Sequence, residues 1–498
     1  MKRKFISLIL LTVSLTLVGC NKQQSSSSNE SKSSEESISE SIEDSSEESS
    51  SEGKITEGTL KERLNQIERI KNVVSIGSTK NFGNVVTFKF EQYIDHNNKE
   101  LGMFDQKVEL GFNSYKSPTV FVTSGYMTMD NNSYYENNEN ELAFLLGCNY
   151  VFVEHRYFGK SVPVDLSGTN NSKWQYLTTK QSADDHHDIV EQLKRVLDGK
   201  WVSTGMSKGG MTTEMFSYYH PGDMDLYLPY VAPFCASFND DSVWKFIYEE
   251  AGNLQYGEEK ATKIRNEVLD FQVKLLEYRD DLATKYYQDG LTSHAQYSEY
   301  ATADLIYDAS VLEFAFGFWQ YDQNYRSIEK CLAMAESTSK QNACYELFTS
   351  VVSASDYAVN SAYLPYYIQA YKELGNYAYD FSYIRNKLTD QSLLKVEQNN
   401  ELSLFWKLVL SAEDSKLEHK ELMNPKIENM LKTTTDNFII IYGSSDPWYA
   451  LRPADVTNRD NISIYVNTKH PHGANISNFD DETQEEIMTK IKTILEVE

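Results

Sequence analysis

Cysteine is scarce in this chain, and its placement argues against a zinc site. The 498 residues include five cysteines, with no CxxC pair and no Cys/His spacing of the kind that binds zinc. Cys331 and Cys344 lie thirteen residues apart in a stretch with helical character. A disulfide between them is possible only in an oxidising compartment, and the sequence leaves that pairing open.

Positive charge is also scarce. Lys and Arg total 47 against 73 Asp and Glu, which gives a formal net charge of −26. Nucleic-acid binding requires clustered Lys and Arg to neutralise phosphates, so we expect no nucleic-acid partner. Hydrophobic residues still make up 40% of the chain. This hydrophobic content is enough for a sizeable core, and 498 residues are more than one compact core usually contains. We therefore expect more than one packed unit.

Long apolar runs are few, and one stands at the N-terminus. Residues 5–18 are apolar and follow the basic residues 2–4, a pattern typical of a secretory signal and too short for a finished membrane span. Leu17-Val18-Gly19-Cys20 resembles a bacterial lipobox, whose cysteine is acylated. We expect a lipoprotein signal peptide over residues 1–20, lipid attachment at Cys20 and a location on the outer face of a bacterial cell membrane. An ordinary signal peptide with an incidental cysteine is the alternative.

Residues 21–53 consist mostly of Ser and Glu. So few apolar groups cannot offset the entropy cost of ordering, and the repeated negative charge extends the chain. We expect a disordered linker that separates the membrane from the folded body.

The rest of the chain combines strand and helix patterns. Residues 54–236 alternate β-branched strands with amphipathic helices, residues 237–432 are helical throughout, and residues 433–498 return to short apolar strands. This order predicts an α/β class and an α/β-hydrolase fold, with a mostly parallel sheet and an inserted helical cap. The expected strands are 85–94, 106–112, 118–123, 150–153, 201–204, 438–442 and 462–466. The expected helices outside the cap are 139–146, 183–197 and one ending at His220.

Gly205-Met206-Ser207-Lys208-Gly209 is a GxSxG motif between an expected strand and an expected helix. A nucleophilic serine requires this shape because a strained strand-to-helix turn projects its Oγ, and the flanking glycines let the two backbones approach. The motif alone is a weak signal, but its context favours Ser207 as a nucleophile.

Two further residues fit the order Ser, Asp, His of this fold. Asp446 follows the expected strand 438–442, and His472 follows the expected strand 462–466. Taken singly, Asp446 could be a turn residue before Pro447, and His472 a surface-loop residue. Together they predict a triad in which His472 is the base and Asp446 orients it. His470, two residues earlier, is the alternative base.

An oxyanion hole completes such a site. Its donors are expected to be the backbone N–H groups of Lys208, which follows the nucleophile, and of Tyr126 in the loop after the strand 118–123. The string Asp184–Asp188 contains two histidines and three aspartates. Adjacent residues on a helix point in different directions, so we expect no metal and no cofactor.

Longer strings around these residues resemble a known family, the secreted prolyl tri/tetrapeptidyl aminopeptidases of bacteria. More distantly, they are similar to the lysosomal prolyl carboxypeptidase and dipeptidyl-peptidase family. The similarity extends over about residues 85–475 and is weakest in the cap. The strings that carry it are 154–163 (EHRYFGKSVP) and 203–212 (STGMSKGGMT), with support from 92–96, 123–126, 229–233, 446–448 and 472–474.

The resemblance implies a serine exopeptidase that favours proline before the scissile bond and takes peptides as substrates. It supports Ser207, Asp446 and His472 as the triad. The matched strings also supply three candidate substrate-binding residues, Glu154, Arg156 and Trp448. The triad alone does not separate peptide from ester substrates, so a carboxylesterase or lipase, or a lipid-anchored binding protein that has lost catalysis, stays an alternative. The oligomeric state is left open.

Overall fold

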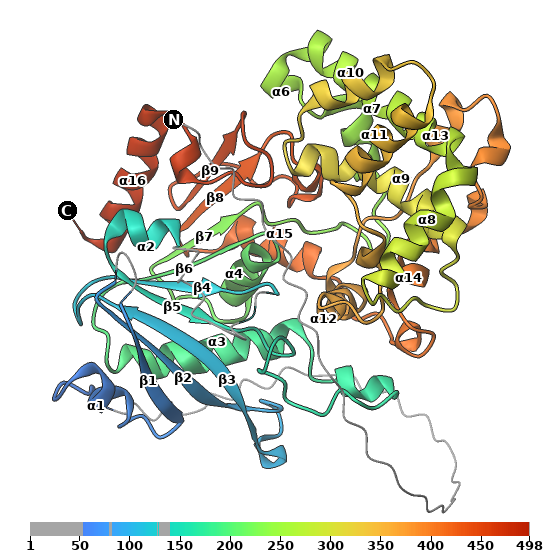
Figure 1. Cartoon of the computed structure of the whole chain (residues 1–498). Helices are drawn as coiled ribbons and strands as arrows, with labels where there is room; N and C mark the ends of the chain where they lie inside the picture. Colours follow the sequence, from blue (N-terminus) through green and yellow to red (C-terminus); the bar gives the residue numbers. More distant parts are fainter. Residues whose placement is uncertain (1–52, 79–81, 127, 129–139, 498) are drawn as a thin grey trace, which may run out of the picture. The chain divides into compact units, whose positions relative to one another are not determined.

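A nine-stranded sheet organises the chain (Figure 1). The structure, a computed structural model, describes residues 53–78, 82–126, 128 and 140–497. The strand order is β1-β2-β3-β5-β4-β6-β7-β8-β9. The strands are β1 (Ile70–Gly77), β2 (Asn84–Tyr93), β3 (Met103–Phe112), β4 (Thr119–Thr123), β5 (Asn149–Val153), β6 (Trp201–Met206), β7 (Leu226–Tyr230), β8 (Phe438–Gly443) and β9 (Ile462–Asn467).

The parallel part of this sheet consists of β5, β4, β6, β7, β8 and β9, in that order. An antiparallel extension is formed by β1, β2 and β3. Every residue of β4, β5, β7 and β8 is buried. Parallel strands are buried on both faces because their crossover connections place helices there, which explains their continuous apolar sequences.

Alternate side chains of the central strands enter two separate cores. Phe121 and Val151 face a core that includes α3 (Thr179–Lys194) and α4 (Lys208–Tyr219). Val120 and Phe152 face the other core, which includes α2 (Glu141–Leu146) and α16 (Asp481–Leu495). The period of two along a strand produces this division. The short helix α1 (Leu60–Leu64) packs beside β1.

Between β7 and β8, the described elements are helices and no strand is present apart from one isolated bridge, Asp240–Tyr377. Figure 1 shows most of these helices as a group beside the sheet. They are α5 (Ser242–Lys245), α6 (Asn253–Tyr256), α7 (Glu258–Glu277), α8 (Arg279–Thr292), α9 (Ala303–Gln320), α10 (Tyr325–Ala333), α11 (Thr338–Thr349), α12 (Leu364–Gln369), α13 (Ser382–Lys387), α14 (Glu401–Val409) and α15 (Met423–Thr433).

The helical segment and the sheet belong to one compact unit, Glu52–Glu498. Buried polar contacts join them: Trp174 Nε1 donates to Asp414 Oδ1 at 2.7 Å, and Lys372 Nζ donates to the carbonyl of Trp174 at 2.8 Å. The last helix of the segment, α15, already packs against α4. The domain boundaries expected at 236/237 and 432/433 therefore stay predictions, and α15 has returned to the sheet before the second of them.

The order from β2 to β9 is that of an α/β-hydrolase sheet, with the serine turn directly after β6. The fold expected from the sequence is therefore confirmed. Relative to the expected elements, β1 and β7 are additional strands.

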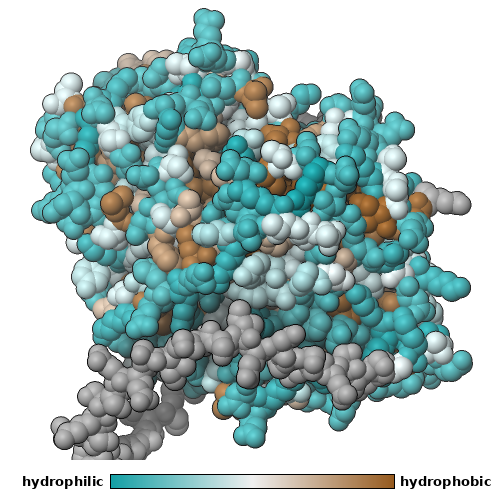
Figure 2. Space-filling model, turned by 180° about the vertical axis from the view of Figure 1, so that it is seen from behind, coloured by the Kyte–Doolittle hydropathy of each residue, from teal (hydrophilic) through white to brown (hydrophobic). Residues whose placement is uncertain are grey.

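The surface of the described part is mainly polar. Figure 2 shows one face on which hydrophilic residues predominate and hydrophobic residues form separate patches. No helix in this part of the chain has the length and apolar character that a membrane crossing requires. The signal, the lipid-attachment cysteine and almost all of the linker lie outside the described residues. The four cysteines within them, including Cys331 and Cys344, are free thiols.

Candidate active site

Ser207 occupies a strained turn at the carboxyl edge of the sheet. β6 ends at Met206, α4 begins at Lys208, and Ser207 between them has φ 57° and ψ −123°. Such a conformation costs a non-glycine residue about 1–3 kcal/mol and persists only where its surroundings impose it. The N–H of Ser207 donates to the Tyr230 carbonyl at 2.9 Å, which fixes the turn to the neighbouring strand β7. This is the nucleophile turn expected from the sequence.

Two glycines allow this turn to form. A Cβ at Gly205 would lie 2.5 Å from the backbone of Gly209, and a Cβ at Gly209 would lie 2.7 Å from the Thr123 carbonyl oxygen. Side chains cannot occupy such distances, so the motif glycines bring α4 directly against the strands.

Asp446 and His472 meet beside the ends of two adjacent strands. Asp446 follows β8, His472 follows β9, and Nδ1 of His472 lies 2.7 Å from Oδ2 of Asp446. Asp446 is 1% exposed and also accepts from the Trp448 N–H at 3.2 Å. A Cβ at Gly443 would lie 2.0 Å from the Pro471 carbonyl oxygen. Glycine at this position therefore permits the His472 loop to pack against the strand that carries Asp446.

His470 has a different environment. Its side chain is exposed, and its N–H donates to Asn467 Oδ1 at 2.9 Å. The geometry therefore favours His472 over His470 as the partner of Asp446.

The side chain of Tyr126 lies near Ser207, which lowers the pKa of its phenol slightly against the larger effect of burial. Among the described residues, no hydrogen bond joins Ser207 Oγ to His472, whose Nδ1 contacts Asp446. Burial raises the pKa of Tyr126, so its phenol stays protonated at neutral pH. In ligand-free hydrolases the serine–histidine contact is often long and closes when substrate binds.

The expected oxyanion donors lie next to one another. The first N–H groups of a helix have no intrahelical acceptor, and the N–H of Lys208 is the first in α4. A Cβ at Gly125 would lie 2.8 Å from Cβ of Lys208. This close approach places the Tyr126 backbone beside the start of α4.

The side chain of Lys208 is buried on the other side of the turn. Its Nζ lies 3.1 Å from Nε2 of His155 and donates to Thr212 Oγ1 at 3.2 Å. Burial lowers the pKa of this amine to about 7. The amine therefore anchors the start of α4 in the protein interior through His155 and Thr212.

Two of the three expected substrate-binding residues have structural roles. Glu154 is fully buried and accepts from Ser161 Oγ at 2.5 Å, and Arg156 is fully buried against Asp185 at 2.6 and 2.7 Å. Burial alone would raise the pKa of Asp185, but Arg156 and His96 hold it below its usual value. Both side chains are thus engaged by internal partners, and the expectation that Glu154 and Arg156 contact substrate stays a prediction. A short string of residues does not distinguish buried ion pairs from binding groups.

Trp448 remains beside the site. It is partly buried, and its ring packs 5.1 Å from Phe316 and 5.3 Å from Tyr377. The Tyr377 hydroxyl donates to the half-buried carboxylate of Glu313 in α9 at 2.8 Å. The helical segment thus supplies the aromatic rings that contact Trp448. It also supplies the carboxyl group of Glu313, which reaches Trp448 through Tyr377. No sequence motif indicated Glu313.

One cluster has the residue types of a metal site. His187, His220 and Asp223 bring potential ligand atoms within 4.8 Å of one another. The two imidazoles are stacked, however, with 4.2 Å between centroids and 9° between planes. Their nitrogen lone pairs lie in the ring planes, so parallel rings do not converge on one ion. His187 and His220 are also already bonded to Asp223 and Asp184, at 2.7 and 2.8 Å. We assign no metal to this cluster.

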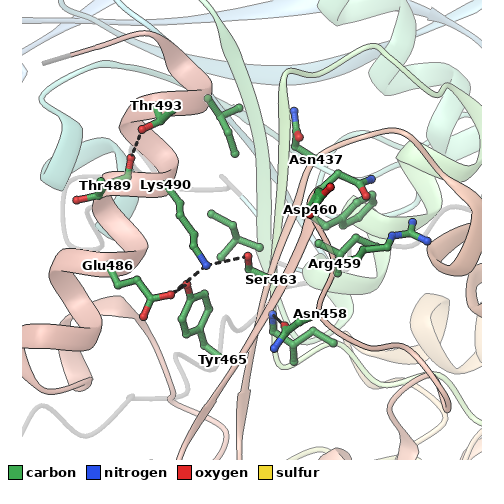
Figure 3. A pocket seen from close by; sticks show the side chains of 16 residues that line it. Asn437, Asn458, Arg459, Asp460, Ser463, Tyr465, Glu486, Thr489, Lys490 and Thr493 are labelled. Atoms are coloured by element: carbon green, nitrogen blue, oxygen red, sulfur yellow. Dashed lines mark hydrogen bonds and ion pairs between the residues drawn. The ribbon is translucent and has the colours of Figure 1, made fainter.

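A hollow of about 570 Å³ lies at the far edge of the sheet, between β9 and α16 (Figure 3). Lys490 reaches across it to Ser463 Oγ at 3.2 Å and pairs with Glu486 at 3.0 Å. Its lining contains none of the candidate catalytic residues. Because Lys490 and Glu486 are paired with each other and Arg459 donates to the carbonyls of Lys432 and Thr434, we attribute no chemistry to this hollow.

Ser207, Asp446 and His472 appear along the chain in the order of the serine hydrolases with an α/β-hydrolase fold, and all three lie at the carboxyl edge of the sheet. The chain matches the PS-10 peptidase S37 family over residues 58–495 and belongs to that family. It is therefore a serine peptidase, and peptides are its substrate class.

The chain is also similar to individual known proteins. The chain is 26% identical to the prolyl tri/tetrapeptidyl aminopeptidase of Streptomyces mobaraensis over 361 residues, which cover 72% of this chain and 69% of that protein. It is 29% identical to the lysosomal Pro-X carboxypeptidase of Homo sapiens over 143 residues, 24% of this chain and 28% of that protein. A solved proline iminopeptidase from Mycobacterium smegmatis aligns over 78% of this chain and 95% of its own, with a TM-score of 0.35 and 9% identity.

Replacing His472 by alanine removes the expected proton acceptor. We expect turnover of a peptide substrate to fall by about 10⁴-fold or more. Replacing the exposed His470 by alanine should leave turnover within about tenfold of the parent, since a solvent-facing side chain takes no part in proton transfer. Both variants are compared by steady-state kinetics after circular dichroism has established folding. The reverse ranking would transfer the base role to His470, and equal small losses would contradict the triad.

Replacing Arg156 by methionine leaves Asp185 as an unpaired buried carboxylate. Removing one partner of a buried pair costs about 3–5 kcal/mol, so we expect a clear fall in melting temperature. KM of the folded variant should stay within about twofold of the parent value. The exposed Arg326, replaced by methionine, is the matched control. A tenfold rise in KM without a loss of stability would indicate a substrate role for Arg156.

Proposed function

We propose that this protein is an exported serine exopeptidase that removes short amino-terminal fragments from peptides by cleavage after proline. The observation that carries the proposal is the 2.7 Å contact between His472 and Asp446 beside the strained turn of Ser207. Membership of a peptidase family and similarity to a prolyl tri/tetrapeptidyl aminopeptidase support the reaction and the proline preference.

In the proposed mechanism, Ser207 Oγ attacks the carbonyl carbon of the scissile peptide bond while His472 accepts its proton. Asp446, held against Nδ1, orients the imidazole and stabilises its charged form. The backbone N–H groups of Lys208 and Tyr126 donate to the developing oxyanion. His472 then gives the proton to the leaving amine, and water hydrolyses the acyl-enzyme by the same steps with water as the nucleophile.

An aminopeptidase requires a partner for the protonated amine of its substrate. Glu313 fits this role, because it contacts Tyr377, and Tyr377 packs on Trp448, two residues after Asp446. Asp356 lies close enough to Glu313 to interact with it electrostatically. A pair of carboxyl groups at a fixed separation from Ser207 would limit the length of the released fragment.

Glu313 also predicts a dependence on pH. Its pKa is raised to about 7, mainly by burial and to a smaller extent by the nearby Asp356, while the Tyr377 and Tyr379 side chains act in the opposite direction. The carboxyl group therefore becomes charged as the pH rises through about 7. The α-amine of a peptide keeps its proton up to about pH 8. Attraction between the two should consequently appear between about pH 6 and pH 8.

For a proline-containing peptide with a free amino terminus, we expect KM to fall as the pH rises over that range. Glu313→Gln should raise KM by about tenfold at pH 8 and abolish this fall, whereas the exposed Glu346→Gln should change neither. An amino-terminally acetylated peptide should be a poor substrate of the parent. Liquid chromatography with mass spectrometry identifies the products. Equal cleavage of free and acetylated peptides by the parent would refute the exopeptidase assignment, and an unchanged pH dependence in Glu313→Gln would remove Glu313 from it.

We also propose that the protein is anchored to the outer face of the bacterial membrane through Cys20. The proposal is supported by the basic, apolar and Leu17-Val18-Gly19-Cys20 order of the first twenty residues, followed by a Ser/Glu-rich tether. Cys20→Ala should release the protein from the membrane fraction or stall its processing, as measured by cell fractionation and immunoblotting. A variant that is matured and retained like the parent would contradict the anchor.

A further inference from the structure

Gln255, in the short helix α6 of the helical segment, contacts both loops that carry the proposed acid and base. Its Oε1 accepts from Ser445 Oγ at 3.0 Å, and its Nε2 donates to the carbonyl of Lys469 at 3.1 Å. Ser445 directly precedes Asp446, and Lys469 lies three residues before His472. One side-chain amide therefore bridges the loop after β8 and the loop after β9.

The chemistry of the amide suits this position. A hydroxyl donor on one side and a carbonyl acceptor on the other require a group that accepts and donates at once, and a carboxamide provides both. A second contact from the helical segment acts nearby: the N–H of His472 donates to the carbonyl of Gln320, the last residue of α9, at 3.3 Å. The side chain of Gln255 and the carbonyl of Gln320 therefore both join the helical segment to the loops that carry the proposed triad.

α6 is itself firmly held. The buried Arg265 of α7 donates to the Ala251 carbonyl at 2.7 Å and to Asn253 Oδ1 at 2.8 Å. Gly252, with φ +83°, lies against Trp319, where a Cβ would come within 2.7 Å of the indole ring. Trp319 adjoins Gln320, so the two contacts to the triad loops start from one packed part of the helical segment.

We propose that Gln255 is a positioning residue that aligns Asp446 with His472, so that the helical segment sets the geometry of the triad in addition to covering it. This inference rests on the catalytic roles proposed above. Catalysis depends steeply on such alignment, because a displacement of about 1 Å costs about 10²-fold in rate. Without the bridge, the two loops would still fold but would be joined less rigidly to each other.

The test compares Gln255→Met with Gln288→Met. The first variant keeps the length of the side chain and removes its hydrogen bonds to Ser445, to Lys469 and, at 3.2 Å, to Asp322 Oδ1. The second makes the same change at an exposed position of α8. We expect kcat to fall by about 10- to 100-fold in Gln255→Met with KM within about twofold, and no change in Gln288→Met. Gln255→Glu keeps an acceptor for Ser445 but loses the donor to Lys469, and should also lower kcat.

A double-mutant cycle with Ser445→Ala tests whether the two residues act together. Because either change removes the same bridge, we expect the double variant to resemble Gln255→Met alone and not the product of the two losses. The proton of the His472–Asp446 hydrogen bond supplies a direct readout by NMR. Its strongly deshielded resonance should broaden or vanish in Gln255→Met and persist in Gln288→Met.

An unchanged kcat and an unchanged resonance in folded Gln255→Met would overturn the inference while the parent enzyme stays active. A rise in KM alone would also overturn it, since that result would indicate substrate contact. A parent protein that cleaves no peptide would refute the proposed function itself, so the two failures are distinguishable.

Discussion

The contact between His472 and Asp446 is the interaction on which the rest of the site depends. The two residues come from different loops, and their 2.7 Å approach requires the β8 and β9 ends to stay in register. Gly443 permits this, because any side chain there would collide with the Pro471 carbonyl. Gln255 then bridges the same two loops from the helical segment. The close packing at Gly443 and the hydrogen bonds of Gln255 therefore hold together the two loops that carry Asp446 and the proposed base, His472.

The conformation of Ser207, the proposed nucleophile, depends on a second constraint, which is backbone strain. Ser207 has a positive φ where β6, β7 and α4 come close together. The buried side chain of Lys208 holds the first turn of α4 through its contact with His155. The buried pair of Arg156 and Asp185 stabilises the neighbouring loop after β5. Residues around the turn are therefore buried for structural reasons, while the groups suited to recognise a peptide come from the helical segment, as with Glu313.

Much of this arrangement was predictable from the sequence because its signals are local. The apolar strands, the glycine-flanked serine and the order Ser207, Asp446, His472 each follow from short patterns. Two strands escaped prediction for physical reasons: β1 exposes most of its side chains, and β7 contains Pro229, which lacks an N–H. Gln255 and Glu313 could not be predicted, since both depend on contacts between segments more than sixty residues apart.

The central claim is that Ser207 is activated by the His472–Asp446 pair. Labelling with a fluorophosphonate tests it most directly, because only an activated serine reacts, and peptide mapping by mass spectrometry locates the adduct. The account predicts one adduct per chain, on Ser207, with formation abolished in Ser207→Ala and slowed by orders of magnitude in His472→Ala. An adduct on another residue, or equal labelling of the parent and His472→Ala, would contradict it.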